Sequence, residues 1–491
     1  MTSKTPSSPP LRLLQLSGVA LLLFLGYAVF SMERLAVQLA DWTTWVLAYF
    51  GDYYLILGLG AVLTLGILAA LPLGKIRLGE GPPEFGWFTW IAMLYSTGMG
   101  GGLMLRAVQE PVFYFLNPPR ETHLDTKVFA LEYTFFHWGF TPWAFYGLMA
   151  LIVAYNLYQK GGPALGSSSL LGNKTHPVWS MLMDFLLVLC TLFGVVAGVG
   201  LGSRQLLEAI MHWTGRSFSS ETVLIPITLL SVVSMISAYF GVRRGISLLS
   251  NLTIGGASLL LIFAWLSGAP LLSLKDFILG LEAYLIDFIP MSLNLGKAKV
   301  GDEFLRDWTY FYWAFWLAWA PFTGVFIARI SKGRSIRELI LGTLLVPSLG
   351  TFFWFAVFGG NSFQLLQTGI VDKEAFSSIY SSLLNYFSVF PFSHLSNFVA
   401  TFLVAAFLIT SIDSAIFVLS MFTDEGKTEP RPGIRIFWGV SILVFTALLV
   451  LLGKDRLLEA VSNLLILFAL PFSFVFVLLA IQLFRKLGHM G

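Results

Sequence analysis

Residues 128–157 read VFALEYTFFHWGFTPWAFYGLMALIVAYNL, an apolar run long enough to cross a ~30 Å hydrocarbon core as a helix. Its central part, residues 135–146, holds two Trp and a Tyr but no acidic residue. Residues 308–319, WTYFYWAFWLAW, repeat the pattern with four Trp. Most membrane Trp form belts at the ends of spans. Four of these Trp instead lie within their spans, which indicates aromatic side chains gathered inside a membrane protein: Trp138, Trp143, Trp316 and Trp319.

A quaternary ammonium group is one ligand that such side chains can hold, because it has no N–H to donate to a carboxylate. Aromatic faces attract it at ~2 kcal/mol or more per desolvated contact. Trp143 and Tyr146 are three residues apart and share a helix face, and the same spacing recurs in the second segment. Trp138 lies on another face, and we expect Pro142 to bend the helix and bring the rings closer. This spacing also suits ordinary packing, so spacing alone does not identify a site.

The composition places the chain in lipid. Its 491 residues are 56% hydrophobic and 12% charged, whereas soluble domains carry roughly 25% charged residues. The net charge of +3 is small, and no basic run indicates nucleic-acid binding. Because lipid offers no partner for open backbone groups, each span is expected to be a helix. Twelve apolar runs predict an all-α integral membrane protein: 13–31, 45–73, 88–116, 128–157, 178–208, 221–242, 251–271, 303–330, 339–360, 393–421, 433–452 and 459–484.

We expect a single transmembrane domain at 13–484, with a disordered stretch at 1–12 and a short end at 485–491. The first apolar run lacks a convincing small-residue cleavage site and is interpreted as a retained helix rather than a signal peptide. Lys and Arg are more frequent in the connections on the side of both termini, which predicts that this side is cytoplasmic, in a cell inner membrane. The single cysteine, Cys190, excludes an intrachain disulfide and a multi-cysteine metal site.

Spans 3–7 and 8–12 are predicted to form two inverted halves, with spans 1–2 as an addition. Span 3 contains Gly98-Met99-Gly100-Gly101-Gly102, and each glycine weakens a helix by roughly 1 kcal/mol relative to Ala. Close packing of helices through small residues is another interpretation. We favour a broken helix, because packing alone needs glycine only at every fourth position. Along the connection at 272–302, an amphipathic pattern at 277–289 predicts a helix lying at the membrane interface.

Taken in order, several motifs resemble the betaine/carnitine/choline transporter family over most of the chain. The resemblance implies a twelve-helix LeuT-type fold with a five-plus-five inverted repeat, usually assembled as a homotrimer. Any one motif could occur by chance, whereas the ordered set is specific. The motifs are LGKIRLGEGPPEF before span 3, GMGGGLM within it, Glu110-Pro111 after it, FFHWGFTPWAFY in span 4, FGVVAGVGLG in span 5, WAPFTGVFIARISKGRSIRELILGTLLVPSLGTFFWFAVFGG through spans 8 and 9, and TSIDS at 410–414.

The resemblance also implies a substrate site. Trp319 corresponds to part of the cytoplasmic-side substrate route, and the family's Trp-Trp pair on span 8 is Phe315-Trp316 here, so one indole beside the box is lost. The glycine-rich break would contact the other end of the substrate, through Met99, Gly100 and Gly101. The aromatic box itself comes from spans 4 and 8: Trp138, Trp143, Tyr146 and Trp316.

Sodium is a hard cation, and unwound backbone carbonyls and hydroxyls supply the oxygen ligands it prefers without burying a full negative charge. The hydroxyls of Thr410 and Ser411 have an alternative, which is to bond back to their own helix. A second family sodium site uses two threonines four residues apart. Here Val195 stands in the place of the partner of Thr191, so we expect one sodium per cycle. The resemblance places the first site between spans 3 and 10, with Ser96, Met99, Phe407, Thr410 and Ser411 as ligands.

Charged residues inside spans are functional candidates. Arg106 stands where the family has an aromatic residue, four positions before Glu110, and Arg204 stands four positions before Glu208. Each arginine either forms a structural pair with its glutamate, which we favour, or lines an outer vestibule and attracts a substrate carboxylate. Two further polar residues are expected to pair within the bundle rather than carry a proton or an ion: His137 and Asp413.

These features predict a secondary active transporter that imports a betaine-type zwitterion or quaternary ammonium compound (betaine, choline, carnitine or a sulfonium analogue) by alternating access. Sodium is expected as the coupling ion, with no other cofactor. The alternative is a sodium-independent exchanger or a carrier of a non-methylated zwitterion. An enzyme is disfavoured because every His except His137 is in or near a loop. A channel is disfavoured because no pore-loop motif recurs.

Overall fold

The computed structural model describes residues 12–121, 124–171 and 177–488, without the side chains of residues 32, 220 and 452–460. Within these residues the regular secondary structure is helical, and the β-type pairing is one isolated bridge between Arg77 and Ser335. The all-α prediction is therefore confirmed. The stretch expected to be disordered, 1–12, lies outside the described residues except for Arg12, which begins the first helix.

The α-helices follow the predicted spans. The first two spans lie in one helix, α1, which is interrupted at Ser31 (φ −143°, ψ 35°), and the last two lie in α17. In chain order the α-helices are α1 (Arg12–Ala70), α2 (Trp87–Gly98), α3 (Gly100–Arg106), α4 (Gln109–Leu116), α5 (Thr126–Trp138), α6 (Phe140–Gln159), α7 (Gly166–Leu171), α8 (Pro177–Thr214), α9 (Leu224–Phe240), α10 (Ser247–Ser267), α11 (Pro270–Ser292), α12 (Asp302–Phe304), α13 (Phe311–Ile330), α14 (Ile336–Gln367), α15 (Ser382–Ser388), α16 (Ser393–Thr423) and α17 (Pro432–Gly488). A π-helical segment, η5 (Leu305–Tyr310), joins α12 to α13.

Among the described residues, eleven helical stretches are long and apolar enough to cross a membrane. The predicted third span is not among them, because it is divided into α2, α3 and α4, of 12, 7 and 8 residues. Met99 has φ −144° and ψ −8° and separates α2 from α3. The glycine-rich segment therefore breaks the helix, as predicted.

The fourth span is also broken, three residues before Pro142. α5 ends at Trp138, α6 begins at Phe140, and Gly139 between them has φ −97° and ψ −124°. A Cβ on Gly139 would lie 2.5 Å from the ring of Phe352, so the approach of this ring leaves no room for a side chain. The bend expected from Pro142 is therefore present. Pro142 has no N–H to donate to the carbonyl of Trp138, four residues earlier, and α5 ends at Trp138.

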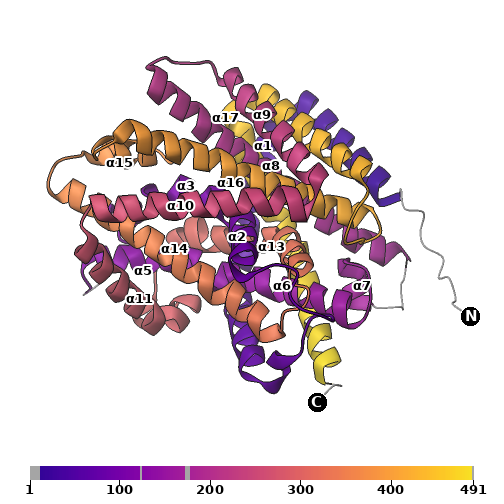
Figure 1. Cartoon of the computed structure of the whole chain (residues 1–491). Coiled ribbons are helices and arrows are strands. Elements are labelled where there is room, and N and C mark those ends of the chain that lie inside the picture. Colours follow the sequence, from indigo (N-terminus) through magenta and orange to yellow (C-terminus); the bar gives the residue numbers. More distant parts are fainter. Residues whose placement is uncertain (1–11, 122–123, 172–176, 489–491) are drawn as a thin grey trace, which may run out of the picture.

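The third helices of the two halves, α8 and α16, pack against each other, and α13 packs along α6. Figure 1 shows α10 crossing in front of α2, with which it is in contact. α1 and α17 run together at the edge of the bundle, at the upper right of Figure 1. The amphipathic segment at 277–289 belongs to the longer helix α11, which covers α5 and α14 from outside. The central position of α2, α3, α6 and α13 sets where a site can form.

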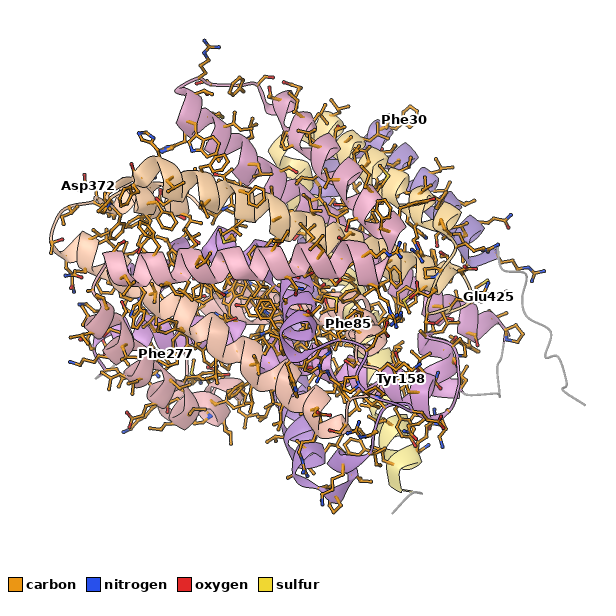
Figure 2. The ribbon with its side chains drawn as sticks, viewed as in Figure 1. Phe30, Phe85, Tyr158, Phe277, Asp372 and Glu425 are labelled. Atoms are coloured by element: carbon orange, nitrogen blue, oxygen red, sulfur yellow. The ribbon has the colours of Figure 1, made fainter. Side chains whose placement is uncertain are left out.

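Two connections mark opposite ends of the molecule. Figure 2 labels Asp372, which lies between α14 and α15, at the left, and Glu425, which follows α16, at the right. Tyr158, at the end of α6, is labelled on the Glu425 side. The Glu425 end carries the basic connections that the sequence analysis assigned to the cytoplasm.

Ion pairs hold the connections at the Glu425 end together, and the pair between Arg329 and Glu84 is buried on both sides. Glu84, before α2, accepts hydrogen bonds from Arg329 at the end of α13 (2.9 Å) and from Arg243 after α9 (2.8 Å). Arg329 also pairs with Glu429 at 2.5 Å, and Glu429 pairs with Arg435 of α17 at 3.4 Å. Burial raises the pKa of Glu84, but the hydrogen bonds and charges of the two arginines outweigh it and leave the pKa below its usual value.

Candidate functional site

A cavity of about 570 Å³ lies between α1, α3, α8, α13, α16 and α17. Its lining includes all of the glycine-rich segment 98–102 and three of the predicted aromatic residues, Trp138, Trp316 and Trp319. Ile379, from the connection between α14 and α15, and the exposed Asp307 line it as well. The cavity therefore reaches the surface on the side of the connection that contains Asp372.

The indoles of Trp138 and Trp316 form the aromatic part of the lining. Their ring centroids are 5.1 Å apart and the planes meet at 69°, an edge-to-face contact. Tyr312 stacks on Trp316 at 5.8 Å and also lines the cavity. The sequence analysis did not assign Tyr312 to the site, although its spacing of four residues from Trp316 on one helix was an available signal. These rings present π faces and edges next to the backbone of the glycine-rich segment.

Trp143 and Tyr146 lie behind this segment and do not line the cavity. Both are fully buried. A Cβ on Gly98 would lie 3.0 Å from Trp143 and 3.4 Å from Tyr146, and the Tyr146 hydroxyl donates to the Gly98 carbonyl at 3.4 Å. Tyr146 is also edge-on to Trp316, at 6.4 Å between centroids. The four predicted box residues are thus neighbours, but only Trp138 and Trp316 of the four face the cavity.

Hydrogen bonds orient Trp316. Its Nε1 donates to the carbonyl oxygen of His137 at 3.0 Å. The His137 ring is fully buried and bonds to the Tyr114 hydroxyl through Nδ1 (2.8 Å) and to the Thr309 hydroxyl through Nε2 (3.0 Å). The prediction that His137 is a hydrogen-bonded packing residue is confirmed by these contacts.

The favoured interpretation of Arg106 is wrong, whereas that of Arg204 is confirmed. In the part of the chain that the structure describes, Arg106 forms no ion pair with Glu110. Its Nη1 donates to the Oε1 of Gln109 at 2.7 Å, and its side chain lines the cavity. Arg204 pairs with Glu208 at 3.3 Å. The difference is physical, because α8 is continuous through Arg204, whereas the helix is interrupted between α3 and α4, which changes the spacing from Arg106 to Glu110.

Two buried acids have hydroxyl partners. Glu110 accepts from the Tyr114 hydroxyl at 3.1 Å and from the Tyr312 hydroxyl. Asp413 accepts from Ser237 at 2.5 Å and from Ser414 at 3.2 Å, which confirms that it pairs within the bundle. Both buried carboxylates thus accept hydrogen bonds from hydroxyl groups of the bundle.

The five predicted sodium ligands lie on facing parts of span 3 and α16. The Ser411 hydroxyl donates to the carbonyl oxygen of Ser96 across this contact at 3.3 Å. The Thr410 hydroxyl bonds back to the Phe407 carbonyl at 2.9 Å, and the Met99 carbonyl accepts from the backbone N–H of Leu103 at 2.9 Å. All five residues are buried. The arrangement brings the predicted oxygen atoms of the two elements together, and their role as ion ligands stays a prediction.

α8 forms the cavity wall next to Trp319. Gly194, Gly198 and Gly202 recur at every fourth position, so they share one helix face. A Cβ on Gly194 would lie 3.1 Å from the Nε1 of Trp319, and one on Gly198 would lie 3.5 Å from the same ring. On the same helix, Val195 lines the cavity, while the Thr191 hydroxyl bonds back to the Leu187 carbonyl at 2.8 Å. Trp319 thus lines the same cavity as Trp138 and Trp316.

Comparison with known proteins shows relatives along almost the whole chain. Residues 12–491 match the family model described as betaine/carnitine/choline family transporter. The chain is 36% identical over 448 residues to the glycine betaine transporter OpuD of Bacillus subtilis (strain 168), which covers 89% of this chain and 87% of that protein. It is 32% identical over 488 residues to the betaine/ectoine transporter LcoP of Corynebacterium glutamicum, covering 96% of this chain and 77% of that protein.

The fold is also similar to that of a solved structure. A Na⁺-coupled sialic acid symporter, in a substrate-bound outward-open state, superposes with a TM-score of 0.50 at 15% sequence identity, covering 87% of this chain and 86% of that one. At this identity the likeness shows the fold alone. The twelve-span, LeuT-type arrangement with two additional N-terminal helices is therefore the fold of this chain.

Proposed function

The chain belongs to the betaine/carnitine/choline transporter family, and we propose that it imports a betaine-type zwitterion or a related quaternary ammonium compound by sodium symport. It is a membrane transporter and not an enzyme. Glycine betaine, named for the Bacillus relative, and betaine and ectoine, named for the Corynebacterium relative, support the proposed substrate class.

One observation carries the proposal: two indoles, Trp138 and Trp316, meet edge-to-face at a cavity within the bundle. The charged residues of the lining are Arg106, Arg306 and Asp307, and the acid among them is at the exposed end. An onium group that enters the cavity has π systems rather than a carboxylate as its partner in the interior. Trp143 and Tyr146 would join the box when Gly98 and the rings around it shift, completing the predicted four-ring site.

Sodium would bind where α16 meets the break in span 3. The Ser411 hydroxyl and the Ser96 carbonyl, which now bond to each other, would both turn their oxygen atoms to the ion. A sodium ion there would tie α16 to the glycine-rich segment and so favour a shape of that segment that holds substrate. This coupling is the physical reason for symport.

Alternating access would follow from movement of one group of helices against the other. The cavity reaches the surface at the Asp372 end, while ion pairs join the connections at the Glu425 end. With both termini cytoplasmic, as the basic connections favour, this arrangement is outward-open. We further propose a multi-pass location in the cell inner membrane and assembly as a homotrimer, both by family membership.

Uptake into liposomes tests the proposal. Purified protein should accumulate labelled glycine betaine when sodium is outside, and potassium should not replace sodium. Trp316→Leu keeps apolar bulk but removes the π face, and a lost contact of ~2 kcal/mol predicts roughly 30-fold weaker betaine binding. Trp354→Leu is the matched control, because Trp354 is equally buried at 3% exposure and does not line the cavity. Equal losses in the two variants would contradict the proposed pocket.

The second candidate is a sodium-independent exchanger. Its support is Val195, which lines the cavity with an apolar side chain where a second sodium site would need a hydroxyl. The same uptake assay separates the two functions. Betaine accumulation at an equal rate in potassium and sodium, together with exchange against internal betaine, would favour the exchanger.

A further inference from the structure

Among the residues that the structure describes, the cavity lining contains one cationic side chain without a carboxylate within 4.0 Å, Arg106. Arg306 and Asp307, the other charged residues of the lining, form a pair with each other at 3.3 Å. Arg106 has no carboxylate within 4.0 Å among the residues that the structure describes. Glu110, on the next helix, accepts hydrogen bonds from two tyrosine hydroxyls instead. An arginine inside a span is expensive unless it has a partner or faces a water-filled cavity. Among the charged side chains that the structure describes in the lining, Arg106 is therefore the one that no lining carboxylate pairs with, and the charge of the buried Glu110 acts on it only through space.

Two contacts hold the guanidinium of Arg106 in place and leave most of its N–H donors available. Nη1 donates to Gln109 at 2.7 Å, and the guanidinium carbon lies 5.8 Å from the centroid of the Trp308 ring. A guanidinium has five N–H donors in a fixed plane, so the Gln109 contact uses one of them. The remaining donors can bind a carboxylate through two parallel hydrogen bonds. Because Gln109 and Trp308 already restrain the side chain, little conformational entropy is lost when a ligand binds.

Arg106 also lies close enough to the aromatic wall of the cavity, formed by Trp138 and Trp316, for one small ligand to reach both. Gly102 lines the cavity four residues earlier on α3, and a Cβ there would lie 3.0 Å from Trp138. Four residues of helix rise ~6 Å, so the backbone of Arg106 is one turn beyond the level at which Trp138 touches α3. A zwitterion whose onium group lies against Trp138 and Trp316 can therefore place its anionic end beside the guanidinium, one turn along α3.

We infer that Arg106 determines specificity by binding the carboxylate of the substrate, so that the site selects onium-carboxylate zwitterions over simple onium cations such as choline. This inference rests on the proposed function, since it assumes that the onium group binds at the aromatic wall. The charge of Arg106 affects the binding of the zwitterion and of the simple cation in opposite directions. The zwitterion adds no net charge and its carboxylate pairs with the guanidinium, whereas a cation without a carboxylate adds a second positive charge in a medium of low dielectric constant.

The test is a cycle of ligands and variants measured by equilibrium binding to the full-length protein in detergent. The ligands are glycine betaine, its methyl ester, which keeps the onium group but lacks the negative charge, and choline. The variants are Arg106→Met and Arg106→Lys. Arg204→Met is the matched control, because it removes another intramembrane arginine that does not line the cavity.

Wild type should bind glycine betaine at least tenfold more tightly than either the ester or choline. In Arg106→Met the betaine and its ester should bind with equal affinity, with choline binding unchanged or tighter. Arg106→Lys should recover part of the preference, and Arg204→Met should keep all of it.

The inference is overturned if Arg106→Met weakens all three ligands by one factor, because that result indicates a structural role. It is also overturned if wild type binds the ester as tightly as the acid, a result that does not require any variant to fold. Binding of neither betaine nor choline to wild type would instead contradict the proposed function itself.

Discussion

At the scale of single residues, the contact between Ser411 and Ser96 is the most direct point at which sodium and substrate can be linked. The two residues belong to α16 and to α2, whose last residue, Gly98, lines the cavity. Ser411→Ala removes one of the proposed ligand oxygens. If that ligand contributes about 1.4 kcal/mol, the sodium concentration for half-maximal betaine uptake should rise about tenfold. The measurement is initial uptake into liposomes as a function of external sodium.

Ser420→Ala is the control for this prediction. Ser420 is buried on the same helix, and its hydroxyl bonds back to the Ile416 carbonyl at 2.7 Å. The change should leave the sodium dependence as it is. An unaltered sodium dependence in Ser411→Ala, with uptake intact, would exclude this hydroxyl from the ion site.

The residue types of the candidate site could be predicted from the sequence, but not which of them face the cavity. The apolar segments and the glycine-rich break identified Trp138 and Trp316 together with Trp143 and Tyr146. Gly139 and Pro142 mark the break in the sequence, but which rings face the cavity depends on packing between distant segments, such as the approach of Phe352 to Gly139. Such contacts leave no local signal in the sequence.

At the scale of helices, two charged side chains four residues apart form an ion pair only where the helix between them is uninterrupted. Arg204 and Glu208 stand on the uninterrupted α8 and form the predicted pair. Arg106 and Glu110 have the same spacing, but the break between α3 and α4 separates them. The sequence predicted the break at Gly98–Gly102. The second break was not predicted, although Pro111 marks it, because this proline has no N–H for the carbonyl of Ala107 four residues earlier. Among the described residues, that second break leaves Arg106 without an ion pair to Glu110, and its guanidinium donates to Gln109 instead.

The ion pairs at the Glu425 end are expected to resist acid poorly. Glu84 and Asp424 both have a pKa below the usual value; burial raises each pKa, and hydrogen bonds from arginine and lysine partners lower it further than burial raises it. An acid whose pKa is lowered by folding stabilises the fold at pH values above its unfolded pKa, and this stabilisation is lost as pH falls through the folded pKa. The melting temperature in detergent should therefore be level from pH 8 to about 5 and fall steeply below about 4.

Glu84→Gln tests this acid sensitivity. It should lower the melting temperature at pH 7, because Arg329, which is 7% exposed, loses one of its two carboxylate partners, and such buried pairs are costly to break. It should also reduce the fall in melting temperature below about pH 4. Glu374→Gln is the control, since its pair with Lys373 is exposed and 4.0 Å long. An unchanged acid slope in Glu84→Gln would mean that other groups control the transition.

At the scale of the whole molecule, the fold class and the spans could be predicted because lipid imposes them. An apolar run of about 20 residues has few alternatives to a helix in a bilayer. The helices that differ from the prediction are those whose ends the length of the apolar run does not define. α1 and α17 each contain two spans, and α11 extends well beyond the amphipathic pattern seen at 277–289. Packing against α5 and α14, rather than periodicity, sets the length of α11.

The direction in which the cavity opens can be tested on intact cells, because the native chain has one cysteine, Cys190, and it is fully buried. Ile379→Cys places a thiol at the cavity lining, and Lys332→Cys places one on an exposed side chain of the connection between α13 and α14. A membrane-impermeant maleimide should label Ile379→Cys from outside and Lys332→Cys only after permeabilisation, since basic connections favour the cytoplasm. Wild type should stay unlabelled.

Substrate should then change the labelling of the cavity. On the proposed function, sodium with glycine betaine would fill the space beside Trp138 and Trp316 and favour closure of the open side, so labelling at residue 379 should slow several-fold. Sodium with choline should slow the labelling less if Arg106 binds the substrate carboxylate. Labelling of Lys332→Cys in intact cells would reverse the orientation, and the Glu425 end would then face outward. In that case the cavity would open to the cytoplasm, and the ion pairs of Glu84 would close the outer side of the transporter instead of the inner side.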